Sequence, residues 1–209
     1  MVNSAVAIFG AGGHAKVVAD VLRAQGTYAV ACFVSREEED AFTPKEDVRG
    51  AIVAIGDNLV RRAVVRRIQE RFPEMELVTA VHPTAYVAPD VEIGPGTVVM
   101  PHAVINAGAK IGSHVIVNTK ASIDHDCLVE DFASIGPGAT LGGSCRIGTL
   151  TAIGLGASVI DKINVGRNTI VGAGAVVVRD VESDVVAYGT PCRSIRRRDA
   201  GDARAEGAG

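Results

Sequence analysis

Histidine side chains are the groups of this sequence best suited to proton transfer near neutral pH, because an unperturbed imidazole titrates there. Of the five histidines, His125 is directly followed by an acidic residue, Asp126. A neighbouring carboxylate favours the charged form of an imidazole. His82, His102 and His114 have no adjacent acid, and we expect them to be turn or surface residues. The His125–Asp126 pair is therefore the leading candidate for general-base chemistry.

A glycine-rich segment is a second candidate site. The stretch GAGGHA at 10–15 follows an apolar run at 5–9 and fits the G-x-G-x-x-[GA] pattern, whose glycines let backbone N–H groups approach a phosphate. The dinucleotide-binding fingerprint also requires an acid after the second strand, where this chain has Ser35-Arg36. NAD binding and a dehydrogenase activity are thus disfavoured, and a nucleotide diphosphate fits the segment better.

Strands alternate with helices in the N-terminal part. Strands are expected at 5–9, 29–34, 51–55 and near 77–80, with one helix ending at Gly26 and another following Gly56. This order predicts a small parallel sheet of Rossmann-like type, whose ligands bind at the carboxyl ends of the strands. The arginines from Arg61 to Arg71 are expected to form a solvated helix face.

The C-terminal half carries a six-residue repeat. Every sixth residue from Val81 to Val177 is Val, Ile or Leu, and a mostly small residue follows four positions later. Six residues fit poorly with the helical period of 3.6 but suit short strands joined by tight turns. Three such strands make an 18-residue coil, and stacked coils form a parallel β-helix. Cys127 and Cys145, one coil apart, are expected to stack in its core.

The repeat also places the candidate residues. His125 falls at a turn, and the residues one coil away, Ala107 and Gly143, are small enough to leave an opening around the imidazole. The outward positions of one face are Val98, Ile116, Ser134, Ala152 and Ile170. This mostly apolar stripe suggests an interface between subunits.

Composition excludes several classes of protein. Hydrophobic residues make up 47% of the 209 residues, which is enough for a sizeable core, and the net charge of -3 gives no basic field for nucleic acid. The uninterrupted apolar runs are too short to span a bilayer, and the N-terminus lacks signal-peptide features. Four scattered cysteines show no zinc spacing. We expect a cytoplasmic protein without a metal or disulfides.

The chain resembles the hexapeptide-repeat acyltransferases, whose prism is a left-handed β-helix. More narrowly, it is similar to the bacterial sugar acetyltransferases that modify nucleotide-linked amino sugars, and to their sialic acid O-acetyltransferase relatives. The resemblance covers roughly residues 4 to 195. The matching segments are GAGGHAKVV, VAIGDNLVRR, VHPTAYVAPDVEIG, VIVNTKASIDHDC, TIVGAGAVVVRDV and YGTPCR.

The resemblance implies a division of the chain and roles for its residues. Residues 1–80 would form a Rossmann-like sugar-nucleotide-binding domain and 81–195 the acyltransferase prism, with 196–209 a disordered tail. His125 would be the general base, and Asp126 the carboxylate that raises its basicity. The remaining matches, to the sugar nucleotide and its amine, are Gly12, Gly13, His14, Ser35, Arg36, Gly56 and Asn118.

Acetyl-CoA is the implied co-substrate, lying in a groove between the prisms of a homotrimer. Leu155 and Ala173 match contact positions, Ser134 replaces a histidine found beside the thioester in some members, and the Gly143 N–H is a candidate oxyanion donor. Lys162, Arg167 and Arg179 either meet the CoA phosphates or are ordinary surface charges.

The predicted activity is N-acetylation of an amino group, at sugar carbon 4, of a nucleotide-diphosphate-linked deoxyamino sugar. The nearest alternative is O-acetylation of sialic acid or another sugar hydroxyl with the same base. Alternatives from other classes are a pure binding scaffold and a zinc enzyme like carbonic anhydrase. The zinc enzyme would need His102, His114 and His125 to converge, and their spacings of 12 and 11 residues do not stack in an 18-residue coil.

Overall fold

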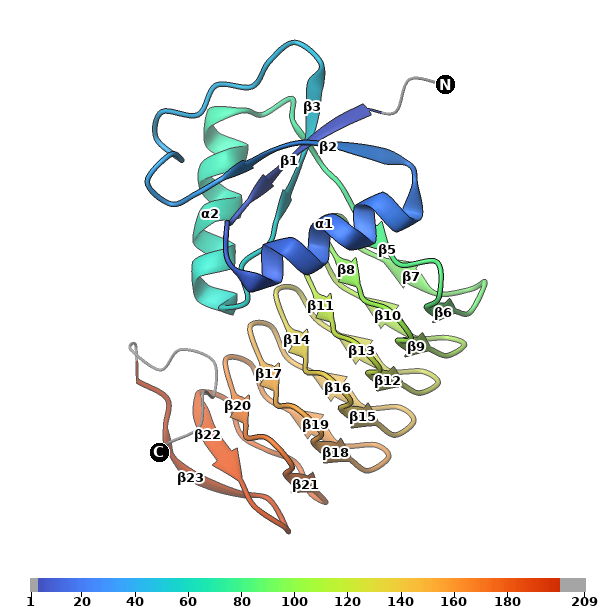
Figure 1. Cartoon of the computed structure of the whole chain (residues 1–209). Helices are drawn as coiled ribbons and strands as arrows, with labels where there is room; N and C mark the ends of the chain where they lie inside the picture. The colour runs from blue at the N-terminus through green and yellow to red at the C-terminus, as the bar shows by residue number, and fades with distance from the viewer. Residues whose placement is uncertain (1–3, 200–209) are drawn as a thin grey trace.

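The computed structural model describes residues 4–199, and its first unit is a parallel α/β domain (Figure 1). The sheet order is β2-β1-β3-β4. The strands are β1 (Ser4–Phe9), β2 (Tyr28–Val34), β3 (Val48–Val53) and β4 (Glu76–Leu77). Helix α1 (Gly13–Gln25) follows β1 and helix α2 (Asn58–Arg71) follows β3. The alternation predicted from the sequence is confirmed.

The two helices cover opposite faces of this sheet, because successive strand residues point to opposite sides. Helix α1 packs its buried Val18 and Leu22 against Val6 and Ile8 of β1. Helix α2 packs on the other face, where its apolar residues meet Phe9. Helix α1 ends at Gly26, as predicted, and Gly26 adopts a left-handed φ of 72°, which is common for glycine at the end of a helix.

The second unit is a prism of three sheets whose strands are all parallel except β23. The eight-stranded sheet contains β5 (Ala80–Val81), β8 (Val98–Val99), β11 (Ile116–Val117), β14 (Ser134–Ile135), β17 (Ala152–Ile153), β20 (Ile170–Val171), β22 (Val185–Tyr188) and β23 (Arg193–Arg197). The six-stranded sheet contains β6 (Tyr86–Val87), β9 (Val104–Ile105), β12 (Ser122–Ile123), β15 (Thr140–Leu141), β18 (Ser158–Val159) and β21 (Val176–Val177). The five-stranded sheet contains β7 (Glu92–Ile93), β10 (Lys110–Ile111), β13 (Leu128–Val129), β16 (Arg146–Ile147) and β19 (Asn164–Val165).

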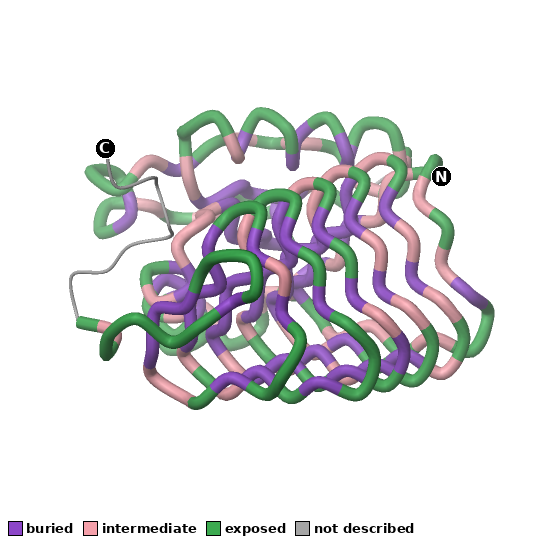
Figure 2. Tube along the Cα trace, turned by 90° about the horizontal axis from the view of Figure 1, so that it is seen from below, coloured by how far each residue is buried: buried purple, intermediate pink, exposed green. Residues whose placement is uncertain are grey.

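Neighbouring strands of each sheet are 18 residues apart; Lys110, for example, pairs with Leu128. The six-residue repeat is thereby confirmed, since the Val, Ile or Leu that it marks is the second residue of every strand from β5 to β21. These residues and the small residues of the turns fill the core of a left-handed β-helix. Figure 2 shows the buried segments recurring from coil to coil. Cys127 and Cys145 are buried in this core, as predicted.

The turns form three corners along the prism. Corner 1 follows the strands of the eight-stranded sheet, corner 2 those of the six-stranded sheet and corner 3 those of the five-stranded sheet. The N-terminal domain lies over the eight-stranded sheet, where α1 residues pack with Ala80, Val98 and Met100 (Figure 1). This docking determines which corners remain open.

The C-terminal end of the prism is extended by a hairpin. β22 pairs with β20 in parallel and with β23 in antiparallel orientation. β23 continues through Arg197, two residues into the segment expected to be a disordered tail; the rest of that segment after 199 lies outside the described residues. Neither helix of the described chain is long and apolar enough to cross a membrane.

Candidate active site

The predicted sugar-nucleotide residues gather at the carboxyl ends of the parallel strands. Gly12 directly precedes α1 and Gly13 and His14 are its first two residues, while Ser35 and Arg36 follow β2 and Gly56 follows β3. The structure therefore brings these six residues to one edge of the sheet, where α/β domains bind their ligands.

Glycine is required at the start of the first loop. Gly10 has a φ of 123°, and a Cβ there would stand 2.8 Å from the carbonyl oxygen of Ala54. Gly12 and Gly13, by contrast, have open space around them and are exposed. A phosphate could approach the backbone N–H groups at this end of α1 without a side chain in the way.

The predicted catalytic pair lies at corner 2, in the turn between β12 and β13. His125 Nδ1 is 2.8 Å from a carboxylate oxygen of Asp126, and 59% of the imidazole side chain is exposed. Asp124 accepts hydrogen bonds from the Asn106 amide and from the backbone N–H of His125. The turn is thus held from both sides while the ring remains open to solvent.

The surroundings of His125 favour its protonated form. The hydrogen bond with Asp126 raises the pKa of His125 above its ordinary value of 6.5, and the negative charges of Asp124, Asp126 and Asp161 act in the same direction. With Nδ1 directed to Asp126, Nε2 is the atom left to accept a proton from a substrate.

Small residues surround the imidazole, as the repeat predicted. Ala107 lies one coil before His125, and Gly143 lies one coil after it in the same corner. A Cβ built on Gly143 would stand 2.5 Å from Nε2 of His125. Only glycine leaves the imidazole room to lie where it does.

The other predicted prism residues are not beside His125. Asn118, Leu155 and Ala173 lie at corner 1, one sheet away from the imidazole. The side chain of Leu155 is strongly exposed, at 61%. Asn118 accepts a hydrogen bond from the N–H of Thr119, and its amide nitrogen donates to no residue between 4 and 199. The two groups of residues thus occupy separate corners of one prism.

Two predictions concerning the outer stripe are wrong. Val98, Ile116, Ser134, Ala152 and Ile170 are all buried within the single chain, with 1 to 6% exposure, so the stripe is no free subunit interface. The N-terminal domain covers it at Val98. Ser134 itself is 2% exposed and offers no surface to acetyl-CoA, contrary to the expectation from its sequence position.

The remaining histidines of the prism lie apart from His125. His102 is at corner 1 and His114 at corner 3, so the three side chains do not converge, as a zinc site would require. His114 is buried rather than a surface residue, and stacks on Phe132 with ring centroids 4.8 Å apart. Burial and the nearby Arg61 lower the pKa of His114 to about 4. No metal-binding cluster occurs among residues 4–199.

The basic helix α2 is not simply a solvated face, which corrects the sequence prediction. Arg61 is buried, Arg67 forms an ion pair with Glu39, and Arg71 donates to the carbonyl oxygen of Glu39. These contacts fasten α2 to the prism and to the loop after β2. Neither the charge pattern nor the periodicity of the sequence predicts these contacts, because a basic residue is usually exposed.

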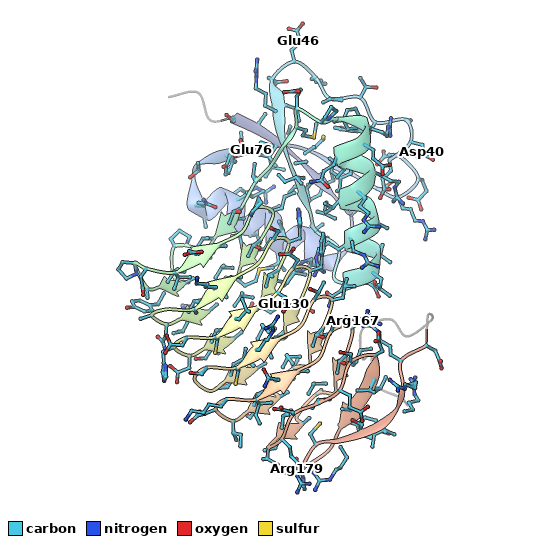
Figure 3. All side chains as sticks on the ribbon, turned by 180° about the vertical axis from the view of Figure 1, so that it is seen from behind. Asp40, Glu46, Glu76, Glu130, Arg167 and Arg179 are labelled. Carbon is cyan, nitrogen blue, oxygen red and sulfur yellow. The ribbon has the colours of Figure 1, made fainter. Side chains whose placement is uncertain are left out.

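The three basic residues considered for the CoA phosphates lie at two different corners of the prism. Lys162 and Arg179 lie at corner 2, in the coils after His125. Arg167 lies at corner 3 and pairs with Asp184 at 3.0 Å. Figure 3 shows Arg167 toward the lower end of α2 and Arg179 at the far end of the prism. Arg167 is therefore engaged on a different side from the imidazole.

A paired imidazole and carboxylate on an exposed corner of a left-handed β-helix, in a chain that also carries an α/β domain with a glycine-rich loop at its carboxyl edge, define a hexapeptide-repeat acyltransferase. The family of the PglD N-terminal domain matches residues 5–68. A comparison with curated protein sequences finds no significant match.

Solved structures extend this likeness over most of the chain. GDP-perosamine N-acetyltransferase of Caulobacter crescentus, crystallised with CoA and GDP-perosamine, is 38% identical at a TM-score of 0.83, over 91% of this chain and 96% of that one. The acetyltransferase domain of PglB from Neisseria gonorrhoeae, in complex with acetyl coenzyme A, is 36% identical at a TM-score of 0.83, over 92% and 100%. WeeI from Acinetobacter baumannii is 25% identical at 0.81, over 91% and 99%. The chain belongs to the nucleotide-sugar N-acetyltransferases of the hexapeptide-repeat family.

Proposed function

We propose that this protein transfers the acetyl group of acetyl-CoA to an amino group, at carbon 4, of a nucleotide-diphosphate-linked deoxyamino sugar. The observation that carries the proposal is the exposed His125–Asp126 pair, joined at 2.8 Å, in a chain similar over 91% of its length to GDP-perosamine N-acetyltransferase. In this proposal, residues 1–80 bind the sugar nucleotide and residues 81–195 carry out the acetyl transfer.

His125 acts as the general base in this mechanism. Its Nε2 accepts a proton from the amine as the amine nitrogen attacks the thioester carbon, so a C–N bond forms and a tetrahedral intermediate results. Asp126 stabilises the resulting imidazolium. The intermediate then collapses with cleavage of the C–S bond, and the proton passes to the departing sulfur, giving the amide and CoA without an acyl-enzyme.

The backbone N–H of Gly143 is our candidate for the oxyanion donor. It donates to no acceptor within residues 4–199, while the Gly143 carbonyl is already bonded to the N–H of Lys162. A Cβ at this residue would lie close to Nε2 of His125, so a base and an N–H donor come together at one place. Donors aimed at a developing negative charge are a large source of catalysis in acyl transfer.

The sugar nucleotide is held at the carboxyl edge of the N-terminal sheet. The exposed backbone of Gly12 and Gly13 at the start of α1 suits the diphosphate, with His14 and Gly56 beside it. Ser35 and Arg36, after β2, take the place of an acid that would bind a ribose, and we assign them to the nucleoside.

A complete site requires a second copy of the chain. His125 lies at corner 2, whereas Asn118 and Leu155 lie at corner 1 of the same prism, so a neighbouring copy is needed to bring these groups into one site. We propose a homotrimer in which corner 2 of one copy faces corner 1 of the next, with acetyl-CoA in the groove between them. Leu155 and Ala173 then contact the cofactor, and Lys162 and Arg179 lie on the side that can meet its phosphates. The cytoplasmic location expected from the sequence stays a prediction.

A thiol-release assay with acetyl-CoA tests the function directly. The acceptors are UDP-, GDP- and dTDP-linked 4-amino sugars, with GDP-perosamine first, and free sialic acid as the hydroxyl acceptor. We expect CoA release that depends on one of the amino sugars, with a blank lacking acceptor to correct for the half-buried thiol of Cys32. Release above the blank with sialic acid alone would favour O-acetylation, and the absence of release above the blank with every acceptor would overturn the proposal.

A further inference from the structure

Arg61 is a buried cation at the junction of the two domains. Its side chain is 1% exposed, although it sits on a helix rich in exposed arginines. A guanidinium stays protonated even when buried, so its N–H groups need acceptors. In this structure they find them on both domains at once.

On the prism side, Arg61 bonds to carbonyl groups that recur every coil. Nε donates to the His114 carbonyl at 2.9 Å and Nη2 to the Phe132 carbonyl at 2.8 Å. Both residues occupy the third position of a corner 3 turn and have left-handed φ values of 56° and 58°. The next member of the series, Leu150 with φ 65°, accepts from Nδ2 of Asn58 at 3.0 Å. Asn58 and Arg61 therefore contact three successive coils.

On the other side, Arg61 bonds to the loop after β3. Nη1 donates to the carbonyls of Ile55 and Gly56, at 2.9 and 3.2 Å, and Nη2 donates to Oδ1 of Asn58 at 2.8 Å. The carbonyl and N–H groups of a trans peptide point in opposite directions. Holding these two carbonyls therefore turns the N–H groups of Gly56 and Asp57 away from the guanidinium.

We propose that Arg61 is a positioning residue for sugar-nucleotide binding. It fixes the Gly56 loop relative to the prism, so the carboxyl edge of the N-terminal sheet keeps a constant position along the prism axis. The inference rests on the proposed role of that loop as a nucleotide contact. It assigns Arg61 no contact with substrate.

The matched test compares R61K with R66K. Lysine keeps the positive charge but cannot reach two loop carbonyls and two turns together, whereas Arg66 is an exposed residue of the same helix. We expect R61K to raise the Kd and KM for the sugar nucleotide by about 10-fold or more, because small displacements of positioning groups have effects of this size. The Kd for acetyl-CoA should stay within about twofold, since the prism binds it.

Titration calorimetry with GDP-perosamine, or with whichever nucleotide-linked amino sugar supports turnover, and separately with acetyl-CoA measures both affinities. Amide hydrogen exchange at 54–58 reports the loop itself and should be faster in R61K than in R66K. Unchanged nucleotide affinity in folded R61K, or equal weakening of both ligands, would contradict the proposal. If R61K does not fold, R61Q decides, because the neutral amide leaves no buried charge but cannot bond to the loop and to the prism turns together. Wild-type-like nucleotide binding and loop exchange in R61Q would then overturn it.

Failure of the proposed function would look different. In that case the wild-type protein would release no CoA with any nucleotide-linked amino sugar. The exchange comparison at 54–58 still tests whether Arg61 holds the loop, since it needs neither turnover nor a bound ligand.

Discussion

The imidazole of His125 lies over Gly143, so close that a Cβ on Gly143 would stand 2.5 Å from Nε2 and 2.6 Å from Cε1. The G143A variant must therefore displace the ring. We expect kcat to fall by about 10-fold or more, because general-base catalysis depends on the reach of Nε2 to the amine. Thermal unfolding should change little, since the ring can swing into solvent.

A double-mutant cycle isolates this effect. If G143A acts by displacing the imidazole, it should add little to the defect of H125A. Full additivity of the two defects would instead indicate that Gly143 contributes mainly through its backbone.

Removal of the base itself is the second prediction. H125A should lower kcat by about 100-fold or more, the usual contribution of a positioned general base. Binding of CoA, measured by calorimetry, should persist. H82A is a suitable control, since His82 contacts Thr84 in the first coil of the prism. Near-normal turnover by H125A would show that His125 is not the general base.

The pH profile tests the partnership with Asp126. The neutral imidazole is the active form, so kcat/KM should rise with pH through the pKa of His125, which Asp126 holds above the ordinary value. D126N removes the negative charge that stabilises the imidazolium, so the rise should move to lower pH. Asparagine suits the left-handed φ of 57° at this position. A profile that does not move would show that Asp126 does not tune the base.

Subunit mixing tests whether sites form between copies. H125A and N118A should each be weakly active alone, the second because the family resemblance assigns Asn118 to the acceptor. In oligomers reassembled from equal amounts, about a quarter of the sites would combine an intact His125 with an intact Asn118 if neighbouring copies supply them. Recovery of activity on mixing is expected; a mixture as inactive as its components would place both residues in one chain's site.

His114 should make stability pH-dependent. Burial and Arg61 keep its pKa at about 4 in the folded protein, while the unfolded chain takes up the proton near pH 6.5. Stability is therefore lost as pH falls from about 6.5 to 4, by about 3 kcal/mol from this group. H114N, whose asparagine tolerates the left-handed turn, should flatten that decline in urea unfolding series. An equally steep decline in the variant would assign the effect to other groups.

The prism could be predicted almost residue by residue, because its core has one repeating requirement. Each coil buries an aliphatic residue such as Ile123 and a small residue such as Cys127 at the same places, so the repeat is visible in one sequence. The turn holding His125 follows directly from the same spacing.

What escaped prediction depends on how the two domains dock. Outward strand residues such as Ile116 and Ser134 face solvent in an isolated prism, and only the folded chain shows that they are covered. Arg61 carries no local signal of burial, since its acceptors lie up to 72 residues away. Long-range contacts of this kind leave no periodic pattern in the chain.

Because Asn58 and Arg61 of α2 bond to successive turns of the prism, insertions can be accommodated only at certain places in the chain. A whole extra coil inserted after Thr151 would lengthen the prism and leave the spacing between the Gly56 loop and His125 as it is. The same insertion between His114 and Phe132 would separate two carbonyls that a single guanidinium bonds. Whole coils can therefore be added, by evolution or by design, toward the C-terminal end of the prism but not in the stretch that contains His125.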